Sequence, residues 1–153
     1  MLQKFDKIAF ACFITSFILD RITKYCVVAE LWPSQTINQF FNVYLTHNQG
    51  IAWGLASSLH TSEFCWLTLI IACVLIYFGW YMKSIAHHTG MLRACMLVLA
   101  GGISNFFDRL SYGSVIDFIQ LHAGGWYFPV FNIADVSITI GAIFLIYFAL
   151  LDE

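Results

Sequence analysis

Charged side chains are scarce in this chain of 153 residues. Only 10% of the residues are Asp, Glu, Lys or Arg, and 60% are hydrophobic, whereas soluble domains carry about 25% charged residues. The formal net charge is −2 and there is no long basic run, so we expect no nucleic-acid partner. The composition is instead typical of a membrane protein.

Several patterns that carry common chemistry are also missing. The cysteines are odd in number and form no Cys-x-x-Cys pair, so a disulfide framework is not expected. There is no His-Glu-x-x-His zinc motif and no glycine-rich phosphate loop. Ser104 has no His or Lys base apparent beside it in sequence. We therefore expect no metal, no cofactor, and neither serine nor cysteine catalysis.

Long hydrophobic runs are what the chain has in abundance. A membrane-spanning helix needs roughly 20 mostly apolar residues, and four segments qualify. These are residues 8–28, 64–82, 91–107 and 132–151. The sequence predicts one domain, residues 1–153, with an all-α membrane fold of four transmembrane helices.

The first hydrophobic run has an alternative interpretation as a cleaved signal peptide. Basic residues precede an apolar stretch, and Val27-Val28-Ala29 would serve as a cleavage site. However, Asp20 and Lys24 lie between the apolar stretch and that site, which disfavours cleavage. We expect an uncleaved first span.

The basic residues predict the orientation of the spans. Lys4 and Lys7 precede the first span, and Lys83 and Arg93 flank the short turn between the second and third. Residues 25–82 and 110–153 contain no Lys or Arg. Because basic residues stay on the cytoplasmic side, we expect both termini in the cytoplasm and the two long connections outside.

The two outer connections have the composition of β-strands. Residues 37–46 are rich in aromatic and β-branched side chains, with a turn at 48–50 and a second strand at 51–55. Residues 114–121 predict a strand, 123–125 a turn and 126–131 an aromatic return. We expect a small β-rich platform on the outer face of the helices.

Under this topology the polar residues of the spans and connections fall into one layer, just inside the outer surface. They are Asp20, Lys24, Asn48, Asn105, Asp108, Arg109, Asp117, Asn132 and Asp135. A carboxylate at hydrocarbon depth costs several kcal/mol unless it is paired or hydrated. Such a gathering indicates a site.

Each polar residue also has a purely structural interpretation. Asp20 and Lys24 are spaced i, i+4 and could simply neutralise each other. Asn132 and Asp135 have the spacing of a helix capping box, and Asn48 could belong to an ordinary turn. These interpretations stay open for single residues, but they do not explain why all of them share one depth.

The chemistry that remains is that of two carboxylates. Two neighbouring carboxylates do not both ionise easily, so they share a proton. The ionised member activates a water molecule and the protonated member polarises a carbonyl, as in aspartic proteases. Alternatives are a proton-coupled carrier, in which Asp20, Asp108 and Asp135 would relay protons, and a non-catalytic scaffold held together by polar contacts.

Five ordered motifs carry a resemblance to a known family. They are DRITK (20–24), NQGIAWG (48–54), GGISNFFDR (101–109), GSVIDF (113–118) and FNIAD (131–135). Their order and spacing resemble those of the lipoprotein signal peptidases, the type II signal peptidases. The resemblance covers nearly the whole chain, although Ile51 and Trp53 stand where the family more often has a small residue and Phe.

The resemblance implies a bacterial inner-membrane aspartic endopeptidase with its active site near the periplasmic face. Asp117 and Asp135 match the catalytic pair. The residues that match those shaping the site or contacting substrate are Asp20, Lys24, Asn48, Gly50, Asn105, Asp108, Arg109, Asn132 and Ala134. The implied substrate is a diacylglyceryl-modified prolipoprotein, cut before its lipidated cysteine. The other implied partners are membrane lipid and peptide-like inhibitors such as globomycin.

Overall fold

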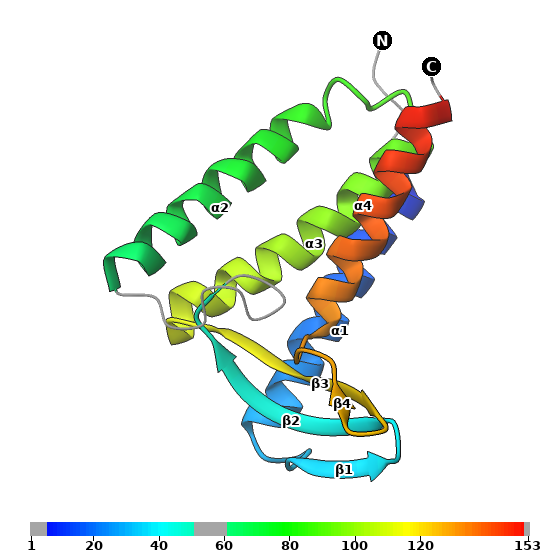
Figure 1. Cartoon of the computed structure of the whole chain (residues 1–153). Helices are drawn as coiled ribbons and strands as arrows, with labels where there is room; N and C mark the ends of the chain where they lie inside the picture. Colours follow the sequence, from blue (N-terminus) through cyan, green and yellow to red (C-terminus); the bar gives the residue numbers. More distant parts are fainter. Residues whose placement is uncertain (1–5, 51–60, 152–153) are drawn as a thin grey trace.

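The described residues form four helices and a four-stranded sheet (Figure 1). The computed structural model describes residues 6–50 and 61–151. The elements in chain order are α1 (Lys7–Val28), β1 (Gln35–Asn38), β2 (Phe41–Asn48), α2 (Thr61–Tyr81), α3 (Thr89–Tyr112), β3 (Val115–Ala123), β4 (Trp126–Tyr127) and α4 (Ile133–Leu151). The sheet lies across one end of the helices, and the start of α1 and the end of α4 lie at the opposite end (Figure 1).

Among the described residues, three helices are long and apolar enough to cross a membrane. They comprise Ser62–Tyr81, Thr89–Tyr112 and Ile133–Leu151. Helix α1 has 22 residues but is not in this set, because Asp20, Arg21 and Lys24 interrupt its apolar sequence. The expected fold of four spans is therefore confirmed for three helices by length and composition. The fourth span remains a prediction.

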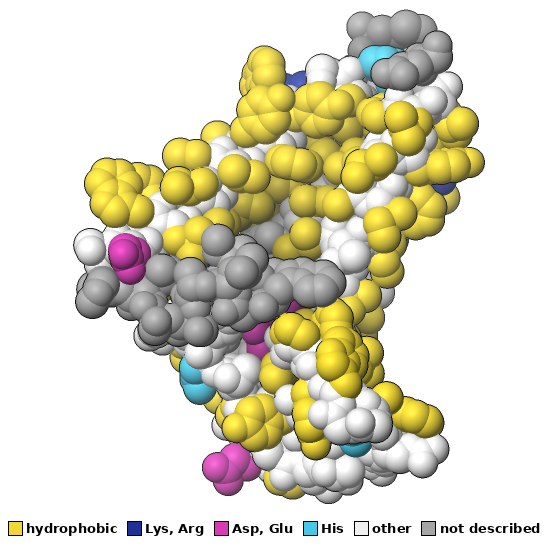
Figure 2. Space-filling view, viewed as in Figure 1, with side chains coloured by type: hydrophobic (Ala, Val, Ile, Leu, Met, Phe, Trp, Pro, Cys, Tyr) yellow, Lys and Arg dark blue, Asp and Glu magenta, His cyan; other side chains and the backbone are white. Residues whose placement is uncertain are grey.

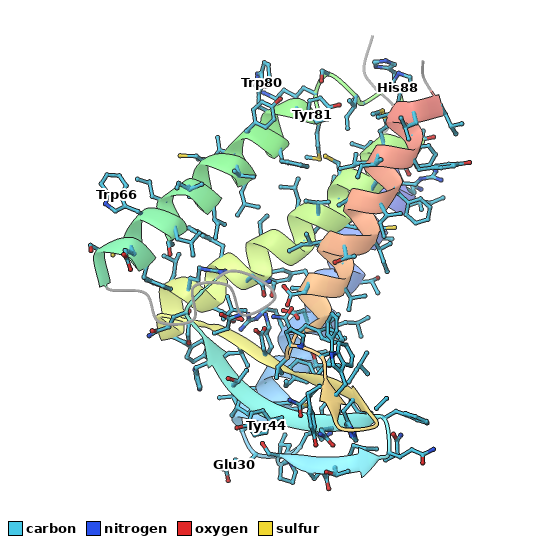
Figure 3. All side chains as sticks on the ribbon, in the orientation of Figure 1. Glu30, Tyr44, Trp66, Trp80, Tyr81 and His88 are labelled. Atoms are coloured by element: carbon cyan, nitrogen blue, oxygen red, sulfur yellow. The ribbon has the colours of Figure 1, made fainter. Side chains whose placement is uncertain are left out.

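The surfaces of the helices agree with a lipid environment. Hydrophobic side chains cover most of the helical part of the face shown in Figure 2. Trp66 and Trp80 lie on α2 and point away from the other helices (Figure 3). They are 66% and 63% exposed. Large apolar side chains exposed in this way are costly in water, so the helices are suited to a bilayer.

The predicted strand over residues 37–46 is wrong as a single element. The chain reverses at residues 39–40, so that β1 and β2 form a hairpin. The Asn38 side chain accepts a hydrogen bond from the Phe40 N–H at 2.8 Å, which is the local contact that favours a turn at asparagine. A two-residue reversal leaves the alternation of apolar and polar residues nearly intact, so composition alone did not reveal it.

The second outer connection follows its prediction more closely. Strand β3 is antiparallel to β2 and pairs with the short strand β4. Gly124 and Gly125 supply the turn with φ values of 57° and 85°, which glycine adopts without steric cost. The aromatic return is a regular strand only at Trp126–Tyr127, and Phe131 then pairs singly with Ile119. The predicted strand at 51–55 lies outside the described residues.

A small apolar cluster fixes the sheet to the helices. Val27 at the end of α1 packs with Val43 of β2 and Phe118 of β3, and all three are buried. Helix α3 ends at Gly113, whose φ of 65° is the left-handed C-cap conformation. The turn at Gly113 leads directly into β3 and places residue 117 beside the helix ends.

Candidate active site

A buried ion cluster joins α1 to α3. The Lys24 Nζ lies 2.8 Å from an Asp20 carboxylate oxygen and 2.7 Å from an Asp108 carboxylate oxygen. Arg21 pairs with the other oxygen of Asp108 at 2.5 Å. Asp20, Lys24 and Asp108 are at most 1% exposed. Two acids and two bases balance one another, which is the condition under which charges are tolerated in a low-dielectric interior.

Asp20 also holds α4 in place. One of its oxygens accepts a hydrogen bond from the Ala134 N–H at 2.8 Å, and the other accepts one from the Ser104 hydroxyl at 2.7 Å. The Ala134 N–H is one of the amides at the start of α4 that has no partner within its own helix. Asp20 therefore does more than neutralise Lys24, because it connects three helices.

Asp117 and Asp135 lie on either side of Asn132. The Asn132 Nδ2 donates to an Asp117 carboxylate oxygen at 2.6 Å. The Asn132 Oδ1 accepts from the Asp135 N–H at 2.8 Å, and an Asp135 oxygen accepts from the Asn132 N–H at 3.3 Å. The last two contacts form the predicted capping box. Asn132 therefore caps α4 and also hydrogen-bonds to both aspartates.

Each of these aspartates accepts a further hydrogen bond from a neutral amide. The Asn48 Nδ2 donates to the other oxygen of Asp117 at 2.9 Å, and the Asn105 Nδ2 donates to Asp135 at 2.8 Å. The pairing of β2 with β3 brings Asn48 to this position. In contrast to Asp20 and Asp108, neither carboxylate has an ion pair among those found in the described part of the chain.

The environment of Asp117 favours its protonated form. Burial of the carboxyl and, secondarily, the negative charge of Asp135 raise the pKa of Asp117 from 3.8 to about 7. The hydrogen bonds from Asn48 and Asn132 and the charge of Lys24 act in the opposite direction. A carboxyl that titrates near neutral pH beside a second carboxyl is suited to general acid–base chemistry.

Arg109 supplies positive charge next to the pair. Arg109 is 8% exposed, and its guanidinium donates a hydrogen bond to the Gly50 carbonyl at 3.0 Å. It interacts electrostatically with Asp135, Asp117 and Asp108. Among the described residues its Nε has no hydrogen-bond partner. Arg109 thus lowers the cost of negative charge at the site without forming an ion pair with either aspartate.

Two apolar cavities meet at Asp135. One of about 480 Å³ lies between α4 and residues 128–131, and it is lined by Phe128, Val130 and Ile140 among others. The second, of about 240 Å³, lies between α2, α3 and α4, where Asn105 and Arg109 also line it. Asp135 lines both. The site can therefore receive apolar groups from two directions.

The structure brings the sequence-predicted site residues together at the junction of helices and sheet, where nitrogen and oxygen atoms gather in Figure 3. Gly50 and Ala134 contribute through their backbones. Sequence reasoning missed Arg21 and the supporting role of Ser104. The signal for both was their position inside the motifs, next to Asp20 and Asn105. Within the described ranges, no group of three His, Cys, Asp or Glu residues is placed to hold a metal ion.

Fold and site together define a class of protein: a helical membrane protein with two buried carboxylates joined by amide side chains. A family model described as Signal peptidase (SPase) II matches residues 12–151. Lipoprotein signal peptidases of Staphylococcus aureus strains JH9 and Newman are each 40% identical over 139 residues, which is 89% of this chain and 83% of theirs. The chain belongs to the signal peptidase II family and is a peptidase, which confirms the resemblance found in its motifs.

Solved structures agree with this assignment. Two structures, each described as a bacterial membrane enzyme, are 35% identical to this chain, with TM-scores of 0.78 and 0.76. The first match covers 98% of this chain and 92% of the other, and the second covers 99% and 97%. The similarity of fold extends over nearly the whole chain, including helix α1 and the sheet.

Proposed function

We propose that the chain is a membrane aspartic endopeptidase that removes signal peptides from diacylglyceryl-modified prolipoproteins. It cuts before the lipidated cysteine, and Asp117 and Asp135 are its catalytic pair. The names of the curated relatives support the class of substrate. The observation that carries the assignment of the pair is the bridge through Asn132, which hydrogen-bonds to both aspartates.

The reaction needs one proton on the pair. The ionised carboxylate takes a proton from water while the resulting hydroxide attacks the scissile carbonyl. The protonated carboxyl donates a hydrogen bond to the carbonyl oxygen, which becomes the oxyanion of a tetrahedral intermediate. Collapse of that intermediate re-forms the carbonyl and breaks the C–N bond, and the amine nitrogen takes up the proton that the first carboxylate had accepted from water. The pKa of Asp117 near 7 supports a shared proton at neutral pH.

The apolar cavities suit the proposed substrate. A signal peptide is hydrophobic and a diacylglyceryl group carries two acyl chains, so both lie in the bilayer before binding. Asp135 lies where the cavities of about 480 and 240 Å³ meet. An apolar group on each side of the scissile bond would therefore remain in an apolar environment. Peptide-like inhibitors such as globomycin would compete for the same space.

The remaining details of location form part of the same proposal. The enzyme lies in the bacterial inner membrane with four spans, both termini in the cytoplasm, and the site near the periplasmic face. The charges of α1 support its role as the fourth span, because Asp20 and Lys24 are buried against the other helices. Most of the exposed side chains of α1 are apolar, including Ile8, Ile18 and Ile22.

The test compares purified wild-type protein with Asp117→Asn and Asp135→Asn on a diacylglyceryl-modified prolipoprotein. Each change keeps the shape of the side chain and removes its acid–base chemistry, so we expect cleavage to fall by on the order of 10³-fold or more. Glu30→Gln is the matched control, since Glu30 is exposed on the platform, and it should cleave normally.

Two results would contradict the proposal. A folded Asp117→Asn or Asp135→Asn variant that cleaves at the wild-type rate would remove that residue from the catalytic pair. Full-rate cleavage of the same precursor without its diacylglyceryl group would remove the lipid from the substrate requirement. Folding of each variant is checked by its thermal transition in detergent.

A further inference from the structure

The Asn105 amide is held in one orientation by a charged neighbour. The Lys24 ammonium group can only donate hydrogen bonds, and it lies 2.7 Å from the Asn105 Oδ1. The amide nitrogen must therefore face the other way, where it donates to Asp135 at 2.8 Å. The Asn132 Nδ2 also donates to the Asn105 Oδ1, at 3.1 Å, which supports the same orientation.

We propose that Lys24 is a positioning residue that acts on Asp135 through Asn105. By occupying the amide oxygen of Asn105, Lys24 directs an N–H group at the Asp135 carboxylate. This N–H group favours the ionised, proton-accepting form of Asp135 and fixes its rotamer. The inference rests on the proposed function, because it assigns a role within the same catalytic pair.

The role is specific to Lys24 because the other members of the ion cluster have additional partners. Asp20 still accepts hydrogen bonds from Ser104 and Ala134 when Lys24 is absent. Asp108 still accepts from Arg21 and from the Ile116 N–H. Asp20 would lose its ion pair but keep its two hydrogen-bond donors. The Asn105 oxygen would keep only the neutral Asn132 donor, so the Asn105 amide would be less strongly held with its N–H group toward Asp135.

Lys24 does not line either cavity that reaches Asp135, and it is 1% exposed. Its substitution should therefore change the chemical step more than substrate binding. Apart from the two aspartates themselves, the charged groups that act on the pair are Arg109 from α3 and Asp20 and Lys24 from α1. Of these, only Lys24 is hydrogen-bonded to the Asn105 side chain among the contacts found.

The experiment is a double-mutant cycle on the full-length protein with a diacylglyceryl-modified prolipoprotein. Its variants are Lys24→Gln, Asn105→Ala and the two combined. A hydrogen bond to a charged group corresponds to roughly 10- to 100-fold in rate. We expect each single change to lower kcat by about that factor with KM nearly unchanged. The double variant should be no slower than Asn105→Ala alone, because both changes remove the same N–H contact.

Lys83→Gln is the control for loss of a positive charge, since Lys83 is exposed far from the site, and it should not alter kcat. If the two single effects multiply in the double variant, Lys24 acts independently of Asn105 and the proposal is overturned. A rise in KM with kcat unchanged would also overturn it.

Asn105→Asp gives a second test if Lys24→Gln does not fold. It retains an acceptor for Lys24 and removes the donor to Asp135, so kcat should again fall at least 10-fold. Wild-type kcat in this variant would contradict the proposal. Asp135→Asn, assayed in parallel, distinguishes failure of the proposed function from failure of the positioning role of Lys24. If it is active, the proposed function fails. If it is inactive while Asn105→Asp is fully active, only the positioning role fails.

Discussion

At the scale of single residues, the four buried aspartates differ in what neutralises them. Lys24 and Arg21 pair with Asp20 and Asp108, whereas Asp117 and Asp135 accept hydrogen bonds from the amides of Asn48, Asn105 and Asn132. An ion pair holds a carboxylate in its charged form, while an amide leaves the carboxyl able to exchange a proton. This difference supports the proposed assignment of Asp117 and Asp135, rather than Asp20 and Asp108, as the catalytic pair.

Burial of Asp117 makes stability depend on pH. Between its unfolded pKa of 3.8 and its folded pKa of about 7, the folded protein keeps a proton that the unfolded chain has released. The free energy of unfolding therefore falls as pH rises through this window, by on the order of 4 kcal/mol from this group. We expect the decline between pH 4 and about 7 to be shallower in Asp117→Asn. Denaturation midpoints in detergent at several pH values measure it, and equal slopes in both proteins would contradict the assignment.

The same carboxyl should limit catalysis on the alkaline side. Because the proposed reaction needs one shared proton, kcat should fall as the pH rises past about 7, the pKa of Asp117. The measurement is kcat against pH with saturating substrate in a single detergent. A constant kcat from pH 6 to pH 9 in wild-type protein would exclude a proton on the pair with this pKa.

The sequence predicts that the polar residues share one depth, but it does not predict which of the aspartates are catalytic and which are structural. The distinction between Asp117 and Asp20 depends on which partner each carboxylate meets across different helices and strands, and hydropathy carries no such information. The five motifs supplied the ranking only through resemblance. The hydrogen bonds from Asn132 to Asp117 and Asp135 are independent physical support for choosing these two aspartates.

At the scale of elements, α3 and α4 approach each other through glycine. A Cβ added at Gly101 would collide with the Ala134 carbonyl oxygen, and one at Gly141 would lie 2.7 Å from the Ala94 carbonyl oxygen. Close helix approach through small residues is a common way to pack helices in lipid. Here it also brings Ala134, and with it the start of α4, against the helix that carries Asn105.

Gly101→Ala should therefore damage both stability and activity. Overpacking of this kind costs roughly 1–3 kcal/mol, and it would displace the start of α4 and with it Asp135. Gly79→Ala is the matched control, because nothing in the described part of the chain lies within 4 Å of an added Cβ there. Thermal transitions and cleavage rates of the two variants give the comparison. If Gly101→Ala and Gly79→Ala have the same thermal transition and the same cleavage rate, α3 and α4 do not need a glycine at residue 101 to pack together.

The helices were more predictable than the strands. Continuous apolar runs predicted the four helices, and α3 extends past its predicted end at residue 107 to Tyr112, where charged residues lie in its final turns. The β1–β2 hairpin was missed because its reversal depends on one side-chain contact at Asn38. Local hydrogen bonds of this kind have no periodic signature in sequence.

At the scale of the whole molecule, α1 is the helix that depends most on its neighbours. Its charged residues interrupt the apolar run, yet Asp20 and Lys24 are buried and bound to α3 and α4. The folded assembly therefore hides groups that would oppose insertion of α1 alone. Hydropathy treats each segment in isolation, which is why it cannot decide whether α1 spans the membrane.

The orientation of the molecule can be tested directly. The sheet and the α2–α3 turn lie at opposite ends of the helices (Figure 1), so a four-span arrangement places them on opposite sides of the bilayer. In a background in which the five cysteines are replaced, Gln39→Cys and His87→Cys introduce single thiols at positions that are exposed. A membrane-impermeant maleimide added to intact spheroplasts should label residue 39 and not residue 87, and lysis should make both reactive. Labelling of residue 87 alone before lysis would invert the topology. Labelling of both before lysis would mean that the helices do not separate these two ends across the membrane.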